Sequence, residues 1–591
     1  MNVKTADLNT IWATLLIEEL IRNGVTQFCI APGSRSTPLV AAVARHAQAR
    51  TVVHFDERGL AFYALGYARA TNRPAAVITT SGTAVANLLP AVVEASMDAV
   101  PMILLTADRP PELRETSANQ TIRQPGIFSH YTRWAFDLPC PDAAIDPALV
   151  LTTVDQACYR ARRTPAGPVH LNCMFREPLI TDTQATAHQI SLERPSLQRW
   201  GMNKLPFTNY RSASSAAHNY AVTEAAEIIA DAKRPALVIG ELRTNEEREA
   251  VLALSRKLEW PTFADITSGI KLGNREEYFI GGYDFILSEP AFASKYCPDT
   301  CLWIGGRVTS ARLTNWLVKA NPRNHVMVSS RPWRHDQHSR VTLHIETDLA
   351  LFCRSLPSVA KSVKAIDWHI NWPHISRLAK DVIDSCFESD LLTEEHATRI
   401  ISRMVPVSGA LFLASSLPVR FMNNFCVQDG ASVPVQCNRG ASGIDGTIAS
   451  AAGYAAGLEK AVTLLIGDQA FLHDLNSLAL LRSAQHPVTI VVLNNEGGRI
   501  FEHLPISRHQ DLLISYFVMS HELEFARSAE QFGLSYHRPR TAEELQSIYS
   551  KLASSGDSAI IEVHIHRLQR QNVQQRLELA VAAMVKKAFL S

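Results

Sequence analysis

Short, continuously apolar runs separated by segments of helical periodicity constrain the fold of this chain more than any other feature. Typical runs are QFCI (27–30), VTLLIG (462–467) and VTIVVLNN (488–495). Strands that are apolar throughout, instead of alternating, indicate a parallel sheet covered by helices on both faces. Because the pattern occurs in three regions, the sequence predicts an α/β protein with three doubly wound parallel-sheet domains.

The chain has 591 residues, which is too long for one hydrophobic core. We expect domains at 1–185, 215–360 and 385–591. Two linkers are expected between them: a polar one at 186–214 and a weakly patterned one at 361–384. Residues 519–533 are expected to be helical.

Composition excludes several functional classes. With 58 Lys+Arg against 57 Asp+Glu, the net charge of +1 gives no bulk attraction to nucleic acid or to an anionic membrane. No apolar run is long enough for a membrane span, and the N-terminal segment lacks a signal-peptide layout. Ten cysteines are scattered through mostly apolar segments, which indicates reduced thiols. We therefore expect a cytoplasmic protein.

Polar residues follow two neighbouring strands of the third domain. Gly467-Asp468 ends one apolar strand and Asn494-Asn495 ends the next, with a flexible EGG segment after it. The carboxyl ends of such strands meet at one edge of a parallel sheet. Carboxylate and amide oxygens suit Mg²⁺, and the helix N-terminus after Gly467 suits a phosphate. The pattern predicts a metal and diphosphate site, although a Gly-Asp pair alone is also a common helix cap.

This pair of segments resembles the motif of thiamine diphosphate-dependent enzymes, with Gln469 where many members have glycine. The resemblance implies thiamine diphosphate and Mg²⁺ (or Mn²⁺) as cofactors. By the same resemblance, Asp468, Asn495 and the carbonyl of Gly497 would bind the metal, and Gly467 and Gln469 would lie at the cofactor.

The segment HFDERGLAFYALGYARA (54–70) resembles the glutamate segment of the same family. Glu57 would then be the catalytic residue, hydrogen-bonded to the cofactor's aminopyrimidine ring. A carboxyl at the mouth of an apolar strand is partly desolvated, which favours its protonated form. The alternative is an ordinary acid at a helix start. Family members place the glutamate and the diphosphate on different subunits, so we expect a homodimer or homotetramer with the active site at the subunit interface.

Five further stretches resemble one subfamily, the 2-succinyl-5-enolpyruvyl-6-hydroxy-3-cyclohexene-1-carboxylate (SEPHCHC) synthases of menaquinone or phylloquinone biosynthesis. The stretches are APGSRSTPL (31–39), TTSGTAVANLLPAVVEA (79–95), SANQTIRQ (117–124), NRGASGIDG (438–446) and GGRIFEHLP (497–505). The resemblance implies a transferase, a carboligase that decarboxylates 2-oxoglutarate and adds the resulting carbanion to isochorismate.

Both of these substrates are dicarboxylates, and arginine binds a carboxylate through two parallel hydrogen bonds. The resemblance implies a substrate site that combines arginines, neutral donors and an apolar wall: Ser34, Arg35, Gln120, Arg312, Arg420, Arg439, Ile500, Phe501 and Leu504. Ile444 would support the bent form of the cofactor, with Ser442 beside it. Simpler alternatives are a solvated Arg35 in its turn, a surface-directed Arg420 and ordinary packing of Ile444. Ala311 stands where the family has a lysine beside Arg312.

Two other functions remain open at this stage. One is a different thiamine diphosphate-dependent decarboxylase or carboligase, which would use a monocarboxylic 2-oxo acid and would not need this arginine set. The other is a non-catalytic cofactor-binding paralogue, which would bind thiamine diphosphate without turning over any 2-oxo acid.

Overall fold

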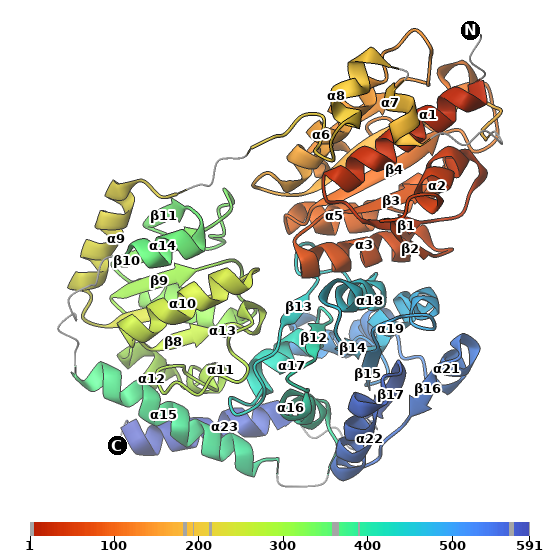
Figure 1. Ribbon diagram of the computed structural model, residues 1–591. Coiled ribbons are helices and arrows are strands. Elements are labelled where there is room, and N and C mark those ends of the chain that lie inside the picture. The colour runs from red at the N-terminus through yellow and green to blue at the C-terminus, as the bar shows by residue number, and fades with distance from the viewer. Residues whose placement is uncertain are drawn as a thin grey trace. The chain divides into compact units, whose positions relative to one another are not determined.

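A computed structural model describes residues 5–180, 186–192, 194–211, 216–356, 366–387, 391–565 and 573–589. The chain forms two compact units. The first contains residues 1–213, 438–460 and 470–488, and the second contains 214–437, 461–469 and 489–591. Three separate parallel sheets confirm the predicted α/β class (Figure 1).

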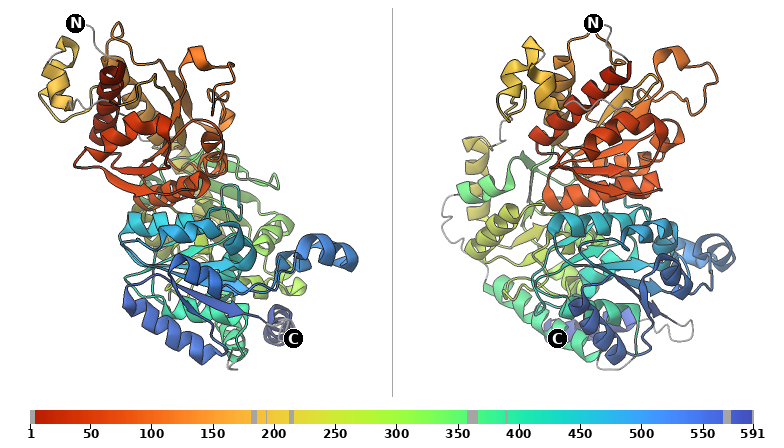
Figure 2. Two further views of the ribbon diagram at one scale, coloured as in Figure 1. Left: turned by 90° about the vertical axis from the view of Figure 1, so that its right-hand side faces the viewer. Right: turned by 45° about the vertical axis from the view of Figure 1, so that its right-hand side comes forward.

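The first unit is built on a six-stranded sheet of order β2-β1-β3-β4-β6-β5, in which every pairing is parallel. Its strands are β1 (Gln27–Ile30), β2 (Arg50–Val53), β3 (Ala75–Thr79), β4 (Met102–Asp108), β5 (Trp134–Leu138) and β6 (Pro168–Met174). Its helices are α1 (Thr5–Arg22), α2 (Thr37–Ala44), α3 (Glu57–Thr71), α4 (Thr83–Ala86), α5 (Leu89–Met97), α6 (Ala148–Arg162), α7 (Ala187–Leu192) and α8 (Gln198–Gly201). Helices lie on both faces of the sheet, as a doubly wound arrangement requires (Figures 1 and 2).

A helix from a distant part of the sequence packs against α3 in this unit. This helix, α18 (Thr447–Leu458), approaches α3 closely because glycines face the contact. A Cβ added to Gly66 would lie 2.0 Å from the carbonyl oxygen of Ser450, and one added to Gly453 would lie 1.9 Å from that of Tyr63. The backbones therefore touch directly, which fixes the helix that begins with Glu57.

The second unit contains two sheets. The five-stranded sheet has the order β11-β10-β9-β7-β8, and the six-stranded sheet has the order β13-β12-β14-β15-β17-β16. The strands of the first are β7 (Pro235–Ile239), β8 (Thr262–Ala264), β9 (Thr300–Ile304), β10 (Asn324–Ser329) and β11 (Leu343–Glu346). Those of the second are β12 (Ala410–Leu413), β13 (Val435–Cys437), β14 (Val462–Gly467), β15 (Val488–Asn494), β16 (Ser535–His537) and β17 (Ala559–His564).

The helices of the second unit come from two parts of the chain, its middle and its C-terminal part. Those from the middle of the chain are α9 (Asn219–Asp231), α10 (Asn245–Leu258), α11 (Tyr283–Ile286), α12 (Pro290–Lys295), α13 (Ala311–Ala320), α14 (Leu349–Ser355) and α15 (Ile366–Ser385). The later ones are α16 (Glu394–Met404), α17 (Leu417–Phe425), α20 (Gln510–Leu512), α21 (Ala526–Phe532), α22 (Ala542–Ser555) and α23 (Val573–Phe589), while α19 (Asp468–His473) runs from this unit into residues of the first.

Much of the two expected linkers is ordered secondary structure. Within 186–214, α7 packs on the core of the first unit through Ala187 and Ile190, and α8 does so through Trp200. Within 361–384, α15 buries Trp368 and Trp372 in the core of the second unit. An internal proline, Pro373, weakens the helical pattern of α15 in the sequence. Residues 193, 212–214 and 361–365 of these linkers lie outside the described residues.

The segment expected to be helical at 519–533 is helical only in part. A π-helix covers Leu513–Val518, and α21 begins at Ala526. Met519 and Glu522 have φ angles of 48° and 51°, which no helix tolerates, so residues 519–525 form an irregular segment. Among the described helices, none combines the length and the apolar character that crossing a bilayer requires.

Candidate active site

The two polar strand ends predicted from the sequence meet in the second unit. Asp468 directly follows β14, Asn495 directly follows β15, and β14 and β15 are neighbours in the sheet. Both side chains are buried, with Asp468 2% and Asn495 6% exposed. The backbone N–H of Gly497 donates to Oδ2 of Asp468 at 2.7 Å. The structure thus brings Asp468 and the EGG segment together, as expected from the spacing.

Gly497 can occupy this position only because it lacks a side chain. Its φ is +128°, and an added Cβ would lie 2.2 Å from the carbonyl oxygen of Val518. Gly498 donates its backbone N–H to the same carbonyl, at 2.6 Å. The EGG backbone is therefore held between Asp468 on one side and Val518 on the other.

Neighbouring side chains orient the two candidate ligands. Nδ2 of Asn495 donates to Glu394 at 2.6 Å, which fixes the amide in one orientation, as ligation through Oδ1 requires. Nε2 of His521 lies 3.2 Å from Oδ2 of Asp468. The backbone N–H of Gln469 donates to Oδ1 of Asp468 at 2.6 Å, while its side chain donates to the carbonyl of Met519.

The chemistry of these atoms fits a hard divalent cation. One carboxylate, one amide oxygen and one backbone carbonyl are oxygen donors of the kind that Mg²⁺ and Mn²⁺ bind. Within the described residues, no cluster of three or more His, Cys, Asp or Glu side chains forms a metal site of another kind. Gly467, at the end of β14, has nothing within 4 Å of its would-be Cβ, so open space adjoins Asp468.

The expected apolar wall lies on a short helical turn after the EGG segment. Ile500 and Phe501 are half-buried, and Leu504 is 45% exposed. The ring of Phe501 packs 5.2 Å from that of Phe517 in the π-helix. These side chains belong to the same unit as Asp468, and their role as a wall remains a prediction.

The two expected substrate arginines of the second unit already have partners inside the protein. Arg420, on α17, is half-buried and donates to the carbonyl of Ser416. Arg312 donates to the carbonyl of Asp284 at 2.6 Å and pairs with Glu578 of α23 at 2.9 Å. A substrate role for Arg312 would therefore compete with an existing ion pair.

Glu57 is the first residue of α3 in the first unit. Asp56 caps this helix through Oδ1, which accepts from the N–H groups of Arg58 and Gly59 at 3.0 and 3.2 Å. Glu57 is half-buried, and its Oε2 accepts from Nδ2 of Asn87 at 3.1 Å. The carboxylate thus stands at a helix N-terminus and is held by one neutral donor.

Ser34 and Arg35 form a single turn of 3-10 helix after β1. Ser34 is exposed, whereas Arg35 is only 6% exposed and donates to the carbonyl of Phe175 at 3.0 Å and to Glu177 at 2.8 Å. The alternative of a solvated Arg35 is therefore wrong: its turn faces inward, toward the end of β6.

A further arginine, Arg109, lies near this point and was not among the predicted residues. It follows β4 directly and donates to the hydroxyl of Ser81, after β3. Burial and the nearby charge of Arg35 lower the pKa of Arg109. The position of Arg109 after an apolar strand, at the same sheet edge as Arg35, was the signal that could have found it.

Gln120 is exposed, and its backbone lies 3.5 Å from the would-be Cβ of Gly82, which follows Ser81.

Arg439, Ser442 and Ile444 lie in the 438–446 loop between β13 and α18. Arg439 is half-buried, while Ser442 is exposed and Ile444 is 38% exposed. A cavity of about 290 Å³ adjoins this loop and is lined in part by Phe62 and Glu94. Glu57, Arg35, Arg439 and Ile444 thus belong to the first unit, and the candidate metal ligands belong to the second.

Comparisons with known proteins identify the family of the chain. The thiamine pyrophosphate enzyme N-terminal TPP binding domain matches residues 12–127, the middle domain of thiamine pyrophosphate enzymes matches 193–413, and the C-terminal TPP binding domain matches 431–563. Three curated relatives are each named 2-succinyl-5-enolpyruvyl-6-hydroxy-3-cyclohexene-1-carboxylate synthase. The chain is 47% identical to the protein of Rubrobacter xylanophilus (97% of this chain, 98% of the relative), 44% to that of Salinibacter ruber (97% of each) and 40% to that of Chlorobium phaeobacteroides (94% and 95%).

These matches cover nearly the whole length of this chain and of its relatives, and the three matched domains follow one another in the order of the three sheets. The chain belongs to the 2-succinyl-5-enolpyruvyl-6-hydroxy-3-cyclohexene-1-carboxylate synthase family of thiamine diphosphate-dependent enzymes.

Proposed function

We propose that the protein decarboxylates 2-oxoglutarate and joins the remaining four-carbon fragment to isochorismate, forming SEPHCHC and CO₂ in menaquinone biosynthesis. The observation that supports this most strongly is 47% identity over 97% of the chain to a relative named for this synthase activity. The arginines in both units are consistent with it, because each substrate carries two carboxylates.

Asp468, Asn495 and Gly497 would hold Mg²⁺ or Mn²⁺, and the metal would bind the diphosphate. When bound, thiamine diphosphate supplies the carbon nucleophile for the 2-oxo group and accommodates the electron pair left by departing CO₂. The protein's part is to position these groups and to handle protons. The bond from Gly497 to Asp468 and the bond from Asn495 to Glu394 keep the ligands in place before the metal arrives.

Glu57 would exchange a proton with a ring nitrogen of the cofactor. Its carboxyl group is suited to this, since Asn87 holds Oε2 and restricts the group to one orientation.

Substrate carboxylates would be bound by arginines at the carboxyl edges of the strands. Arg35 and Arg109 lie near one point, beside the carboxylates of Glu177 and Asp108, and would bind a substrate carboxylate there. Arg439 and Arg420 would supply the remaining cations. Ile500, Phe501 and Leu504 would exclude water while CO₂ leaves.

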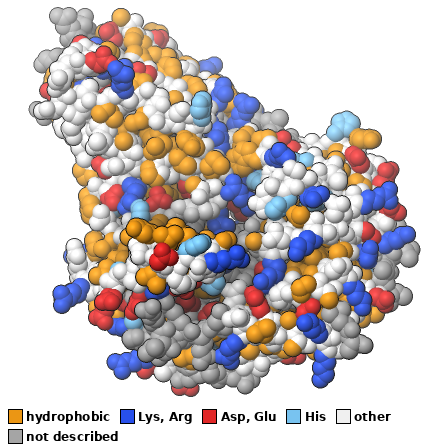
Figure 3. Space-filling model, turned by 180° about the vertical axis from the view of Figure 1, so that it is seen from behind, with side chains coloured by type: hydrophobic (Ala, Val, Ile, Leu, Met, Phe, Trp, Pro, Cys, Tyr) orange, Lys and Arg blue, Asp and Glu red, His pale blue; other side chains and the backbone are white. Residues whose placement is uncertain are grey.

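We also propose that the protein acts as a homodimer or a larger homo-oligomer with the site at the subunit interface. Val53 and Phe55, which lead into Glu57, are each 61% exposed, an unusual state for apolar side chains beside a catalytic residue. Hydrophobic side chains also gather on the face of the molecule seen in Figure 3.

Substrate choice tests the proposal. Mass spectrometry of the products should show SEPHCHC from 2-oxoglutarate and isochorismate with thiamine diphosphate and Mg²⁺, and no adduct when pyruvate replaces 2-oxoglutarate. Equal or better use of pyruvate would instead indicate a monocarboxylate decarboxylase or carboligase of the same fold. Binding of the cofactor without any product would indicate a non-catalytic paralogue.

A further inference from the structure

The 438–446 loop carries three candidate site residues but has little regular structure of its own. It contains three glycines, and Ser442 and Gly446 have φ angles of 59° and 60°. Ala441, Ser442 and Ile444 are exposed. A glycine-rich loop has high conformational entropy, so its geometry must be fixed by contacts with other parts of the protein.

A buried carboxylate holds the first end of this loop. Glu94, on α5, is 2% exposed. Its Oε1 accepts from the backbone N–H of Gly440 at 2.8 Å, and its Oε2 accepts from that of Ala441 at 2.6 Å. Two charge-assisted bonds from consecutive N–H groups fix the orientation of the peptide that follows Arg439.

The loop also approaches α5 as closely as its backbone allows. A Cβ added to Gly440 would lie 2.6 Å from the carbonyl oxygen of Glu94 and 3.0 Å from the Cβ of Asp98. Only glycine fits between the loop and this helix, so the contact is a built feature and not a chance proximity of two surface groups.

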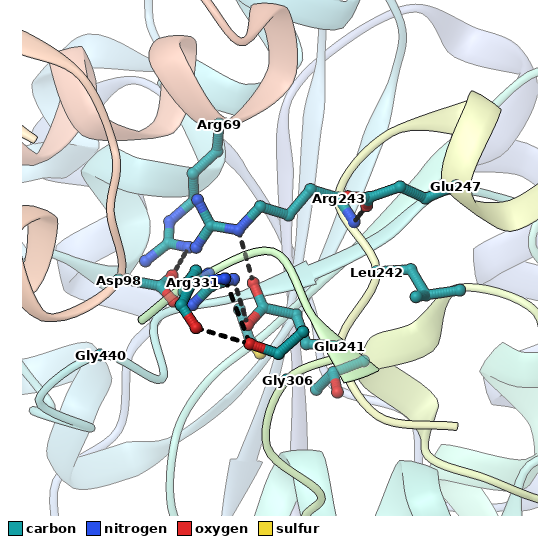
Figure 4. A network of polar contacts seen from close by, with 12 residues as sticks. Arg69, Asp98, Glu241, Leu242, Arg243, Glu247, Gly306, Arg331 and Gly440 are labelled. Atoms are coloured by element: carbon teal, nitrogen blue, oxygen red, sulfur yellow. Dashed lines mark hydrogen bonds and ion pairs between the residues drawn. The ribbon is translucent and has the colours of Figure 1, made fainter. Parts of the chain in front are cut away.

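Arg69, on α3, holds Glu94 in turn. Nη2 of Arg69 lies 2.7 Å from Oε1 of Glu94, and Nη1 pairs with Oδ2 of Asp98. All three side chains are at most 6% exposed. Figure 4 shows Arg69 directed toward Asp98, with the backbone of Gly440 nearby. The helix that begins with Glu57 is thereby linked, through Glu94, to the loop that carries Arg439.

A second buried carboxylate holds the other end of the loop. Oδ2 of Asp474 accepts from the backbone N–H groups of Ile448 and Ala449 at 2.7 and 3.1 Å, in the first turn of α18. The helix has no side-chain cap of its own, because its N-cap residue is Gly446. Asp474 therefore supplies the missing cap from a distant part of the sequence, and Ser477 fixes its orientation at 2.7 Å.

We infer that Glu94 and Asp474 are positioning residues, which hold the two ends of the 438–446 loop so that Arg439 is fixed for the substrate. Neither carboxylate need touch a reactant. This inference rests on the proposed function, because it assigns the loop's task in that reaction.

The first test measures the loop itself. Hydrogen–deuterium exchange of the full-length protein would be followed in peptides covering 438–449. In a Glu94→Gln variant, one N–H of the loop would face an amide NH₂ and lose its acceptor. We expect the exchange rate of the loop's backbone amides to rise about tenfold, while the exchange rates in α1 stay unchanged. Unchanged exchange in the loop would overturn the inference. Glu289→Gln, which alters a buried carboxylate that caps α12, serves as the matched control.

The second test asks whether Glu94 acts through Arg439. In the wild-type background, Glu94→Gln should lower kcat/KM for isochorismate about tenfold. In an Arg439→Ala background the same change should have less than about a twofold effect, because the group being positioned is gone. An equal loss in both backgrounds would show general destabilisation and would overturn the inference.

Two other variants keep the test decisive if Glu94→Gln does not fold. Gly440→Ala pushes the loop away from α5 without changing any charge, and Asp474→Asn removes an acceptor at the other end. Each should show the same dependence on Arg439. If the wild type makes no product at all, the proposed function fails, while the exchange measurement still decides whether these carboxylates hold the loop.

Discussion

Gly497 donates its backbone N–H to Oδ2 of Asp468 across 2.7 Å, and this bond joins the ends of two neighbouring strands. A carboxylate that already binds the EGG backbone is placed to bind a cation together with the carbonyl of the same segment. The bond is therefore a preformed part of the proposed metal site.

Asp468→Asn should weaken Mg²⁺-dependent binding of thiamine diphosphate. Loss of the charge removes charge-assisted interactions worth about 1.5–3 kcal/mol, so affinity should fall roughly tenfold to hundredfold. Isothermal titration calorimetry with and without Mg²⁺ measures this. Asp557→Asn changes an exposed aspartate in the loop before β17 and should leave the affinity unchanged. Equal affinities for the wild type and Asp468→Asn would remove Asp468 from the metal site.

Arg439→Ala and Arg35→Ala should both impair use of the dicarboxylate substrates. Each should lower kcat/KM for these substrates roughly tenfold to hundredfold. Arg35→Ala should also lower the melting temperature, since Arg35 is buried and bonds to Phe175 and Glu177. Arg123, in the SANQTIRQ stretch, has a side chain 90% exposed and offers a control that should change neither quantity. Full activity of Arg439→Ala would exclude it from the substrate site.

Gly66→Ala should destabilise the first unit. The added methyl group would lie 2.0 Å from the carbonyl oxygen of Ser450, so α3 and α18 must separate, at a cost of roughly 1–3 kcal/mol. Thermal unfolding followed by circular dichroism measures the change. At Gly409 an added Cβ would lie 3.3 Å from its nearest neighbour, the carbonyl oxygen of Pro406, so Gly409→Ala should cost much less than Gly66→Ala. An unchanged melting temperature for Gly66→Ala would contradict the close packing of these helices.

The stability contributed by Glu19 should depend on pH. Glu19 accepts from Trp200 at 2.5 Å and from the backbone of Phe207 at 2.6 Å, which attaches the segment after α8 to α1. Burial, with the neighbouring Asp155, raises the pKa of Glu19 from 4.5 to about 8. A raised pKa means that the folded state binds the proton of Glu19 more tightly than the unfolded state does. The contribution of Glu19 to the free energy of unfolding is therefore complete below about pH 4.5 and is lost as pH rises through 8.

Comparison with Glu19→Gln isolates this contribution. The glutamine variant cannot titrate, so the difference in melting temperature between the wild type and the variant should shrink between pH 5 and pH 9. A difference that stays constant across this range would mean that Glu19 is ionised throughout. Differential scanning calorimetry at a series of pH values measures it.

Continuous apolar runs made most of the strands predictable. β1, β14 and β15 lie at the positions predicted from the sequence. Helices cover both faces of their sheets, so the side chains of these strands are apolar on both faces. β5, WAFDL, was missed because it is an edge strand in which exposure alternates along the chain. β8 and β16 were missed because each has only three residues and lies at the edge of its sheet.

The candidate site was predictable only in part. Asp468 and Asn495 follow strands, so the rule for parallel sheets brought them together. No such rule reveals that Glu94 binds Gly440, 346 residues away, or that Asp474 caps α18. These contacts depend on how α18 packs against α3, which follows from the shapes of glycine-containing helix faces and not from local sequence.

We expect Glu57 and the cofactor to drive an isochorismate-dependent loss of CO₂ from 2-oxoglutarate. The most direct measurement is CO₂ release with thiamine diphosphate and Mg²⁺, with and without isochorismate, for the wild type and Glu57→Gln. We expect release that isochorismate stimulates and that the variant lowers by roughly a hundredfold or more, while the variant still binds the cofactor. Release from Glu57→Gln at the wild-type rate, or wild-type turnover of pyruvate but not of 2-oxoglutarate, would contradict the account.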